Sequence, residues 1–286
     1  MSEPSGHNID VNALRRAIAE GELFLEYQPK VALASGDLSG VEALARWRHP
    51  QLGRVPPSEF IPLAETSGLI DLLTRWVAGA AARQWSAWRD AGLMTPISFN
   101  VSAVNLAHID FPDTIDDILR DAGADCVNFE IELTESATQS TVNLLDTLTR
   151  LRLRGMRISL DDFGTGYSSL LQLQRLPFSA IKIDRSFVID AERSEDCRVI
   201  IRSIIDLAHN LGMNAIAEGV ESETTLKLLY DLGCDAAQGY HIGRPMAGTA
   251  LLDFARSRDA VQPKEAAPAE LAEPNKLRRI VRQKRA

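Results

Sequence analysis

The stretch RISLDDFGTGYSSLLQLQRLPFSAIKIDRSF, residues 157–187, contains two short apolar runs typical of strands, 157–163 and 180–187, on either side of an amphipathic segment. Six more segments have the same strand-like character. They are residues 23–33, 39–47, 96–102, 128–135, 214–221 and 235–242. From the third of these eight segments onward, helical spacing of apolar residues fills every gap. Strands that alternate with helices form parallel sheets, and eight repeats predict an α/β fold closed as a modified TIM (β/α)8 barrel.

The first two strand segments are joined differently from the others. Only the short turn ASGDLSG, residues 34–40, separates them, and such a link suits an antiparallel hairpin. We therefore expect one strand of the barrel to run against the rest. The domain should cover residues 10–257, after a flexible N-terminus at residues 1–9.

The last part of the chain has a different composition. Residues 258–286 are rich in Ala, Pro and charge, and the part from Lys276 onward contains six basic residues and no acidic one. A disordered, basic-ended tail is the simplest interpretation. A contact of LRRIVRQKR with a membrane surface, a nucleic acid or a protein partner is the alternative.

Composition limits the possible functions and compartments. The chain has 286 residues, of which 45% are hydrophobic. Its formal net charge of −8 argues against general nucleic-acid binding. No apolar run approaches the ~18 residues that a membrane span needs, and the N-terminus lacks the core of a signal peptide. Three widely spaced cysteines without metal-binding motifs fit a reducing compartment. We expect a cytoplasmic protein with no sensor domain before the barrel, so that regulation acts through dimerisation, partners, the tail or expression.

Two adjacent carboxylates, Asp161 and Asp162, end the apolar run at 157–163. Placing like charges side by side raises a pKa or recruits a cation, so a metal is the simplest explanation of the pair. Neighbouring residues of a strand point to opposite sides. Both carboxylates can therefore serve one centre only where the backbone turns, which we expect at Gly164 and Gly166.

Side chains at alternating positions of the strand segments separate into an apolar and a polar face. In VEALARW, residues 41–47, Glu42, Leu44 and Arg46 share one face. In a barrel the polar faces point inward, near the rim where active sites form. The inward set comprises Glu42, Asn100, Glu130, Glu132, Lys182 and Asp184, together with Asp161, Asp162 and Glu218. Carboxylate and amide oxygens without His or Cys favour Mg²⁺ or Mn²⁺ over Zn²⁺.

Nine motifs follow one another between residues 10 and 256: YQPKV, EALARWRHP, FIPLAE, FNVS, ELTES, DDFGTGYSSL, KIDRSF, AEGVE and QGY. In this order they resemble the EAL-domain cyclic-di-GMP phosphodiesterase family, named for the residues found here at 42–44. The resemblance implies a barrel whose first strand runs antiparallel, and a homodimer. It also implies two Mg²⁺ or Mn²⁺ ions and hydrolysis of cyclic-di-GMP to linear 5′-pGpG, which lowers this second messenger in bacterial signalling of biofilm formation or motility.

The resemblance also implies roles for individual residues. Lys182, Glu42, Glu218 and Gln238 would be catalytic, with Lys182 polarising the attacking water. The metal ligands would be Glu42, Asn100, Glu132, Asp161, Asp162 and Glu218, with Asp162 bridging to the second ion. Substrate contacts would come from Gln28, Leu44, Arg46, Asp184 and Gln238, and Glu135 would anchor the DFGTGYSS loop that couples dimerisation to metal binding.

Two other functions compete with this interpretation. A non-catalytic cyclic-di-GMP receptor acting through a partner protein would bind the same nucleotide, but receptors of this fold usually lack metal ligands or the equivalent of Lys182. A different metal-dependent barrel enzyme that abstracts a proton beside a carboxylate fits the motifs less well. Departures from the family pattern are small: HIGRP follows QGY, and Ser179 stands where Asp is common.

Overall fold

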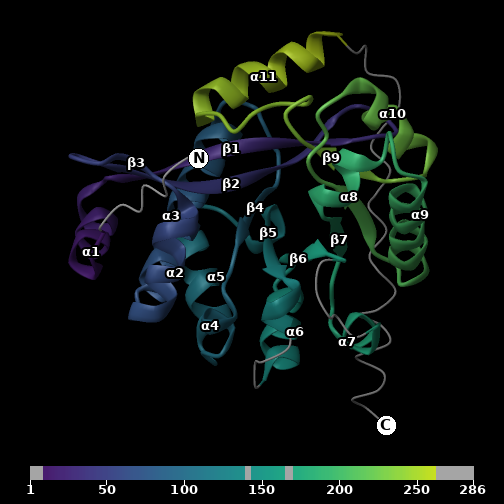
Figure 1. The fold of residues 1–286 in the computed structure, drawn as a ribbon. Coiled ribbons are helices and arrows are strands. Elements are labelled where there is room, and N and C mark those ends of the chain that lie inside the picture. Colours follow the sequence, from purple (N-terminus) through teal and green to yellow (C-terminus); the bar gives the residue numbers. More distant parts are fainter. Residues whose placement is uncertain (1–8, 139–142, 165–169, 262–286) are drawn as a thin grey trace, which may run out of the picture.

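Eight strands close into a barrel in the computed structural model, which describes residues 9–138, 143–164 and 170–261 (Figure 1). The order around the barrel is β1-β9-β8-β7-β6-β5-β4-β2, and β2 closes the ring by pairing with β1. The strands are β1 (Leu23–Ala32), β2 (Leu38–His49), β3 (Gly53–Val55), β4 (Ile97–Asn100), β5 (Phe129–Thr134), β6 (Arg157–Phe163), β7 (Ala180–Ile183), β8 (Asn214–Ala217) and β9 (Ala236–Gln238). All eight predicted strands are present, so the predicted barrel is confirmed.

Helices follow the strands and cover the outside of the barrel (Figure 1). The α-helices are α1 (Val11–Glu20), α2 (Pro57–Ser67), α3 (Ile70–Asp90), α4 (Ala103–Leu106), α5 (Phe111–Asp121), α6 (Leu144–Leu153), α7 (Leu170–Arg175), α8 (Arg185–Asp190), α9 (Glu195–Asn210), α10 (Glu223–Asp231) and α11 (Gly248–Val261). Two 3-10 helices are η1 (Cys126–Asn128) and η2 (Glu135–Thr138). Within the described ranges, no helix is both long enough and apolar enough to cross a membrane.

The first barrel strand runs antiparallel to both of its neighbours, as predicted. β1 pairs antiparallel with β2 and with β9, whereas the other neighbouring barrel strands are parallel. A ninth strand, β3, pairs antiparallel with the end of β2 outside the barrel. The sequence pattern did not predict it. The turn between β2 and β3 depends on His49, whose Nδ1 accepts backbone hydrogen bonds from Gln51 at 3.1 Å and Leu52 at 3.2 Å.

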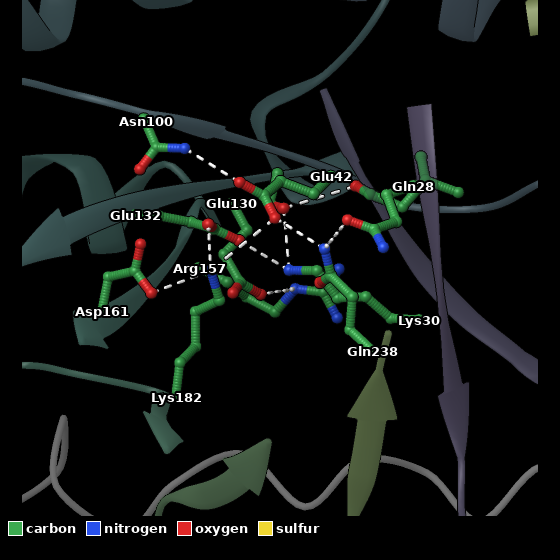
Figure 2. Close-up of polar contacts among 12 residues, drawn as sticks. Gln28, Lys30, Glu42, Asn100, Glu130, Glu132, Arg157, Asp161, Lys182 and Gln238 are labelled. Atoms are coloured by element: carbon green, nitrogen blue, oxygen red, sulfur yellow. Dashed lines mark hydrogen bonds and ion pairs between the residues drawn. The ribbon is translucent and has the colours of Figure 1, made fainter. Parts of the chain in front are cut away.

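The barrel strands have an apolar outer face and a polar inner face. On β5, Ile131 and Leu133 are fully buried against the helices, and the ring of Phe129 lies 6.3 Å from that of Trp85 on α3. Between them, Glu132 points inward and is equally buried (Figure 2). Burying a charged group without partners is costly, so the barrel interior has to supply its counter-charges.

The last helix continues beyond residue 257, where we predicted the domain to end. Arg258 donates a 2.7 Å hydrogen bond to the carbonyl of Gly36 and lies over the ring of Phe254. The contact with Gly36 joins α11 to the turn between β1 and β2, and the helix ends at Val261. The predicted flexible residues 1–8 and the rest of the predicted tail, 262–286, lie outside the described residues.

Candidate functional site

Seven strands bring the predicted site residues to one end of the barrel interior (Figure 2). Parallel strands expose their carboxyl ends at the same rim, which is where barrel active sites form. The residues that meet there are Glu42 (β2), Asn100 (β4), Glu132 (β5), Asp161 and Asp162 (β6), Lys182 (β7), Glu218 directly after β8, and Gln238 (β9). The antiparallel β1 adds Gln28, which lies opposite Glu42 in the register.

The ammonium group of Lys182 lies at the centre of the carboxylates. Its Nζ atom is 2.5 Å from Glu132 Oε2, 2.6 Å from Glu218 Oε1, 2.9 Å from Asp161 Oδ1 and 3.8 Å from Glu42 Oε2. The side chain is only 1% exposed. Lys182 is therefore an internal counter-ion shared by four carboxylates.

Asp161 and Asp162 both reach the site because the strand is irregular between them. Asp162 has a φ of 53°, in the left-handed region, and the pairing of β6 with β7 shifts between Leu160 and Phe163. Carboxylate oxygens of Asp161, Asp162 and Glu218 consequently lie within 4.8 Å of one another. The backbone turn that we expected at Gly164 and Gly166 already begins at Asp162; Gly166 lies outside the described residues.

A second group of side chains surrounds Glu42. Asn100 Nδ2 donates to Glu42 Oε1 at 3.0 Å, and Gln238 Nε2 donates to Glu42 Oε2 at 2.7 Å. Gln238 Nε2 also lies 3.0 Å from Gln28 Oε1, and Gln28 in turn donates to the carbonyl of Gly243 at 3.1 Å. Within the described part of the chain, the buried Gln238 Oε1 has no hydrogen-bond partner. It is thus an acceptor directed into a polar site.

Charge crowding changes the proton affinities of these groups. Burial disfavours the charged form of Lys182, but Glu132, Glu218, Glu42 and Asp161 outweigh burial and raise its pKa well above the usual value. Burial also acts against ionised Glu132, yet Lys182 and Lys30 lower the pKa of this carboxyl.

Three other carboxyl groups of the site have raised pKa values. Burial and the charge of Glu132 raise the pKa of Glu42. Burial raises the pKa of Glu218 to about 8, with Asp161 adding to the effect. Burial and the charges of Asp161 and Asp184 raise the pKa of Asp162. A proton on Glu218 therefore balances part of the excess negative charge below about pH 8.

The donor set fits hard divalent cations. Among the described residues, five carboxylates of the site face two ammonium groups, Lys30 and Lys182, which leaves three formal negative charges. Oxygen ligands with this excess of charge match Mg²⁺ or Mn²⁺. Asn100 would have to turn its amide so that Oδ1 faces a cation beside Glu42.

The predicted substrate residues lie at different places along the rim. Leu44 and Arg46 continue the inner face of β2 beyond Glu42, and Arg46 Nε contacts Glu26 Oε2 at 2.8 Å. Asp184 is the N-cap residue of α8, and its Oδ1 accepts a 2.9 Å hydrogen bond from the amide of Ser186. A phosphate at Arg46 would therefore share this guanidinium with Glu26.

Glu135, the predicted loop anchor, is buried at the start of η2. The loop it would hold includes residues 165–169, which lie outside the described ranges. Its anchoring role stays a prediction.

One buried residue of the site was missed. Lys30 Nζ lies 2.6 Å from Glu132 Oε1 and 2.8 Å from Ser98 Oγ. Its position in YQPKV, two residues after Gln28 and hence on the same face of β1, was the available indication.

Comparisons with known proteins agree with this geometry. The EAL domain family profile matches residues 11–245. The chain is 42% identical over 241 residues to the bifunctional diguanylate cyclase/cyclic di-GMP phosphodiesterase MucR of Pseudomonas aeruginosa, covering 84% of this chain and 35% of MucR. It is 41% identical over 246 residues to the cyclic di-GMP phosphodiesterase NbdA of the same organism, covering 85% of this chain and 31% of NbdA. The chain thus spans about a third of the length of these curated relatives.

Solved structures give the same result. The structure of the PaMucR phosphodiesterase in complex with c-di-GMP matches with a TM-score of 0.80 and 41% identity, over 84% of this chain and 98% of that one. The EAL domain of Mycobacterium smegmatis DcpA matches with a TM-score of 0.71 and 33% identity, over 82% of this chain and 98% of that one.

Proposed function

Because the chain belongs to the EAL domain family, we propose that it is a phosphodiesterase that hydrolyses cyclic-di-GMP to linear 5′-pGpG. The names of the relatives described above support the choice of substrate. The single observation that carries the proposal is the set of carboxylates gathered around the buried ammonium of Lys182. A protein that only binds the nucleotide has no need of this concentration of negative charge beside an anionic ligand.

Two cations, Mg²⁺ or Mn²⁺, complete the proposed site. Glu42, Asn100, Glu132 and Asp161 would hold one of them, and Asp162 with Glu218 would hold the other beside Asp161. When bound, such ions neutralise the charge of the phosphodiester and lower the pKa of a coordinated water.

The side chains of the protein orient the reactants. Lys182 Nζ, released from part of its carboxylate contacts, donates to the attacking water and balances the charge that develops on the phosphate oxygens. Gln238 Oε1 accepts a hydrogen bond from the same water, since it has no partner in the described part of the protein. Gln28, Leu44, Arg46 and Asp184 would contact the nucleotide at the rim.

A direct assay tests this function. Purified protein is incubated with cyclic-di-GMP and Mg²⁺ or Mn²⁺, and the products are separated by chromatography. We expect linear pGpG, and we expect EDTA to stop its formation. Tight binding of intact nucleotide in the presence of either ion would refute the phosphodiesterase and support the receptor alternative.

The biological setting is also part of the proposal. All three cysteines, Cys126, Cys197 and Cys234, are free thiols, which supports a reducing cytoplasm. We propose a homodimer, which light scattering tests, and regulation through a partner protein. Consumption of cyclic-di-GMP would then change outputs such as biofilm formation or motility.

A further inference from the structure

A second polar layer lies inside the barrel, beneath the proposed metal site. We call it the lower layer, and its residues are Lys30, Ser98, Glu130, Arg157 and Ser159. Most of them stand one strand repeat below a residue of the rim: Lys30 below Gln28, Ser98 below Asn100, Glu130 below Glu132 and Ser159 below Asp161. Within the described part of the chain, one member of this layer forms an ion pair with a proposed metal ligand.

That member is Lys30. Its Nζ atom lies 2.6 Å from Glu132 Oε1, and both side chains are almost completely withdrawn from solvent, at 6% and 0% exposure. A second hydrogen bond of 2.8 Å joins Nζ to Ser98 Oγ, which itself donates to the carbonyl of Val41 at 3.3 Å. Strand β4 and the backbone of β2 therefore hold the ammonium of Lys30 in place.

The two oxygens of Glu132 have different partners (Figure 2). Lys182 approaches from the rim, and its Nζ lies 2.5 Å from Oε2. Lys30 approaches from below, and its Nζ lies 2.6 Å from Oε1. A cation at the rim would compete with Lys182 for Oε2 and would leave the contact of Lys30 with Oε1 in place. Lys30 thus keeps the carboxylate turned so that one oxygen faces the rim.

The remaining charged pair of the lower layer is loosely joined. Arg157 Nε lies 3.6 Å from Glu130 Oε2, beyond hydrogen-bond distance. Within the described ranges, Glu130 Oε1, Arg157 Nε and Ser159 Oγ have no hydrogen-bond partner. Glu130 is buried like Lys30, at 8% and 5% exposure, and within the described ranges it forms no hydrogen bond or ion pair with a proposed ligand, which makes it a matched control.

We infer that Lys30 is a positioning residue for the metal site: it fixes Glu132 from inside the barrel and thereby sets the affinity of the rim for divalent cations. The inference rests on the proposed function, because it takes Glu132 to be a metal ligand. Groups that orient metal ligands from behind typically change metal affinity 10- to 100-fold when they are removed. We therefore expect Lys30→Met to weaken Mn²⁺ binding by about 10- to 100-fold.

The test measures Mn²⁺ binding by isothermal titration calorimetry on the full chain, without nucleotide. Wild type is compared with Lys30→Met, Glu130→Gln and the double variant Lys30→Met/Glu130→Gln. The double variant removes one negative charge together with the positive one, so the net charge of the lower layer does not change. We therefore expect this variant to fold. Weaker Mn²⁺ binding in both variants that lack Lys30, with Glu130→Gln close to wild type, is the expected result.

Turnover of cyclic-di-GMP gives a second readout. At saturating Mn²⁺, we expect variants that lack Lys30 to recover kcat with an unchanged KM for the nucleotide, because Lys30 acts through the cation site. If Lys30 had a merely structural role, the calorimetric stoichiometry would fall because fewer molecules could bind Mn²⁺. The Kd of the molecules that still bind would be unchanged.

An Mn²⁺ Kd within twofold of wild type in the double variant, or an equal loss in Glu130→Gln, overturns the inference. These outcomes differ from failure of the proposed function. If wild type binds no Mn²⁺ and makes no pGpG, the phosphodiesterase proposal fails; if wild type does both and the variants bind Mn²⁺ equally well, only the role of Lys30 fails.

Discussion

Replacing Lys182 with methionine should lower turnover and yet strengthen cation binding. Lys182 Nζ lies within 2.9 Å of Glu132, Glu218 and Asp161, so without bound cations it occupies the oxygens that cations would use. In Lys182→Met these oxygens no longer have to exchange an ammonium for a metal. The same change removes the donor that would hold the attacking water.

The size of each effect follows from the burial of the site. Breaking a buried ion pair by removing one partner costs about 3–5 kcal/mol. In a domain of this size, each kcal/mol of lost stability lowers the Tm by about 2–4 °C. The Tm of the metal-free protein should therefore fall by about 6 to 20 °C. The same energy limits the gain in Mn²⁺ affinity to about 10²-fold at about 3 kcal/mol and about 4 × 10³-fold at about 5 kcal/mol, at about 1.4 kcal/mol per tenfold. Loss of a charged donor to the reacting group should lower kcat by about 10²- to 10³-fold.

Three measurements separate these effects: thermal unfolding with and without Mn²⁺, calorimetric titration of Mn²⁺, and pGpG formation at saturating Mn²⁺. Lys227→Met is the matched control, because Lys227 is exposed on α10 and the substitution is the same. A kcat within tenfold of wild type would refute the catalytic role of Lys182. Weaker Mn²⁺ binding in Lys182→Met would refute the competition between the ammonium and the cations.

Further predictions concern the ligands, the pH dependence and a glycine. Glu42→Gln should abolish pGpG formation in the chromatographic assay, because a proposed ligand loses its charge; an unchanged rate would contradict the metal assignment. Because Glu218 has a pKa of about 8 without cations, Mn²⁺ must displace its proton below that pH. Calorimetry should therefore show affinity that falls from pH 8 to pH 6, and a flat profile would argue against Glu218 as a ligand. Gly239→Ala should destabilise the protein by about 1–3 kcal/mol or more in urea unfolding, since its Cβ would overlap the backbone of Val220, and full stability would contradict this packing.

The sequence was sufficient to predict the barrel and the inward direction of the polar side chains. Strand periodicity assigns a side chain to a face without any knowledge of its neighbours. That rule placed Glu42, Glu132 and Lys182 inside the barrel, and the structure brings them together. The short turn after β1 likewise predicted the antiparallel strand, because it leaves no room for a helical crossover.

Contacts across the barrel interior could not be predicted in the same way. Periodicity places Lys30 on an inner face, but its contact with Glu132 depends on how the closed barrel sets the strands against each other. The left-handed backbone of Asp162 is equally hidden, because a residue other than glycine gives no sign of a positive φ. Strand β3 has three residues, too few for a periodic pattern.

The positions of the two lysines around Glu132 give them opposite roles towards a cation. Lys182 lies at the rim and binds the oxygen that faces the proposed metals, so it balances the charge of the site when cations are absent. Lys30 lies below and binds the other oxygen, so we expect its stabilising contact to persist when cations bind. Removing a competitor strengthens binding, whereas removing a support weakens it. The same substitution by methionine should therefore change Mn²⁺ affinity in opposite directions at two residues that share one carboxylate, a result that a general loss of stability cannot produce.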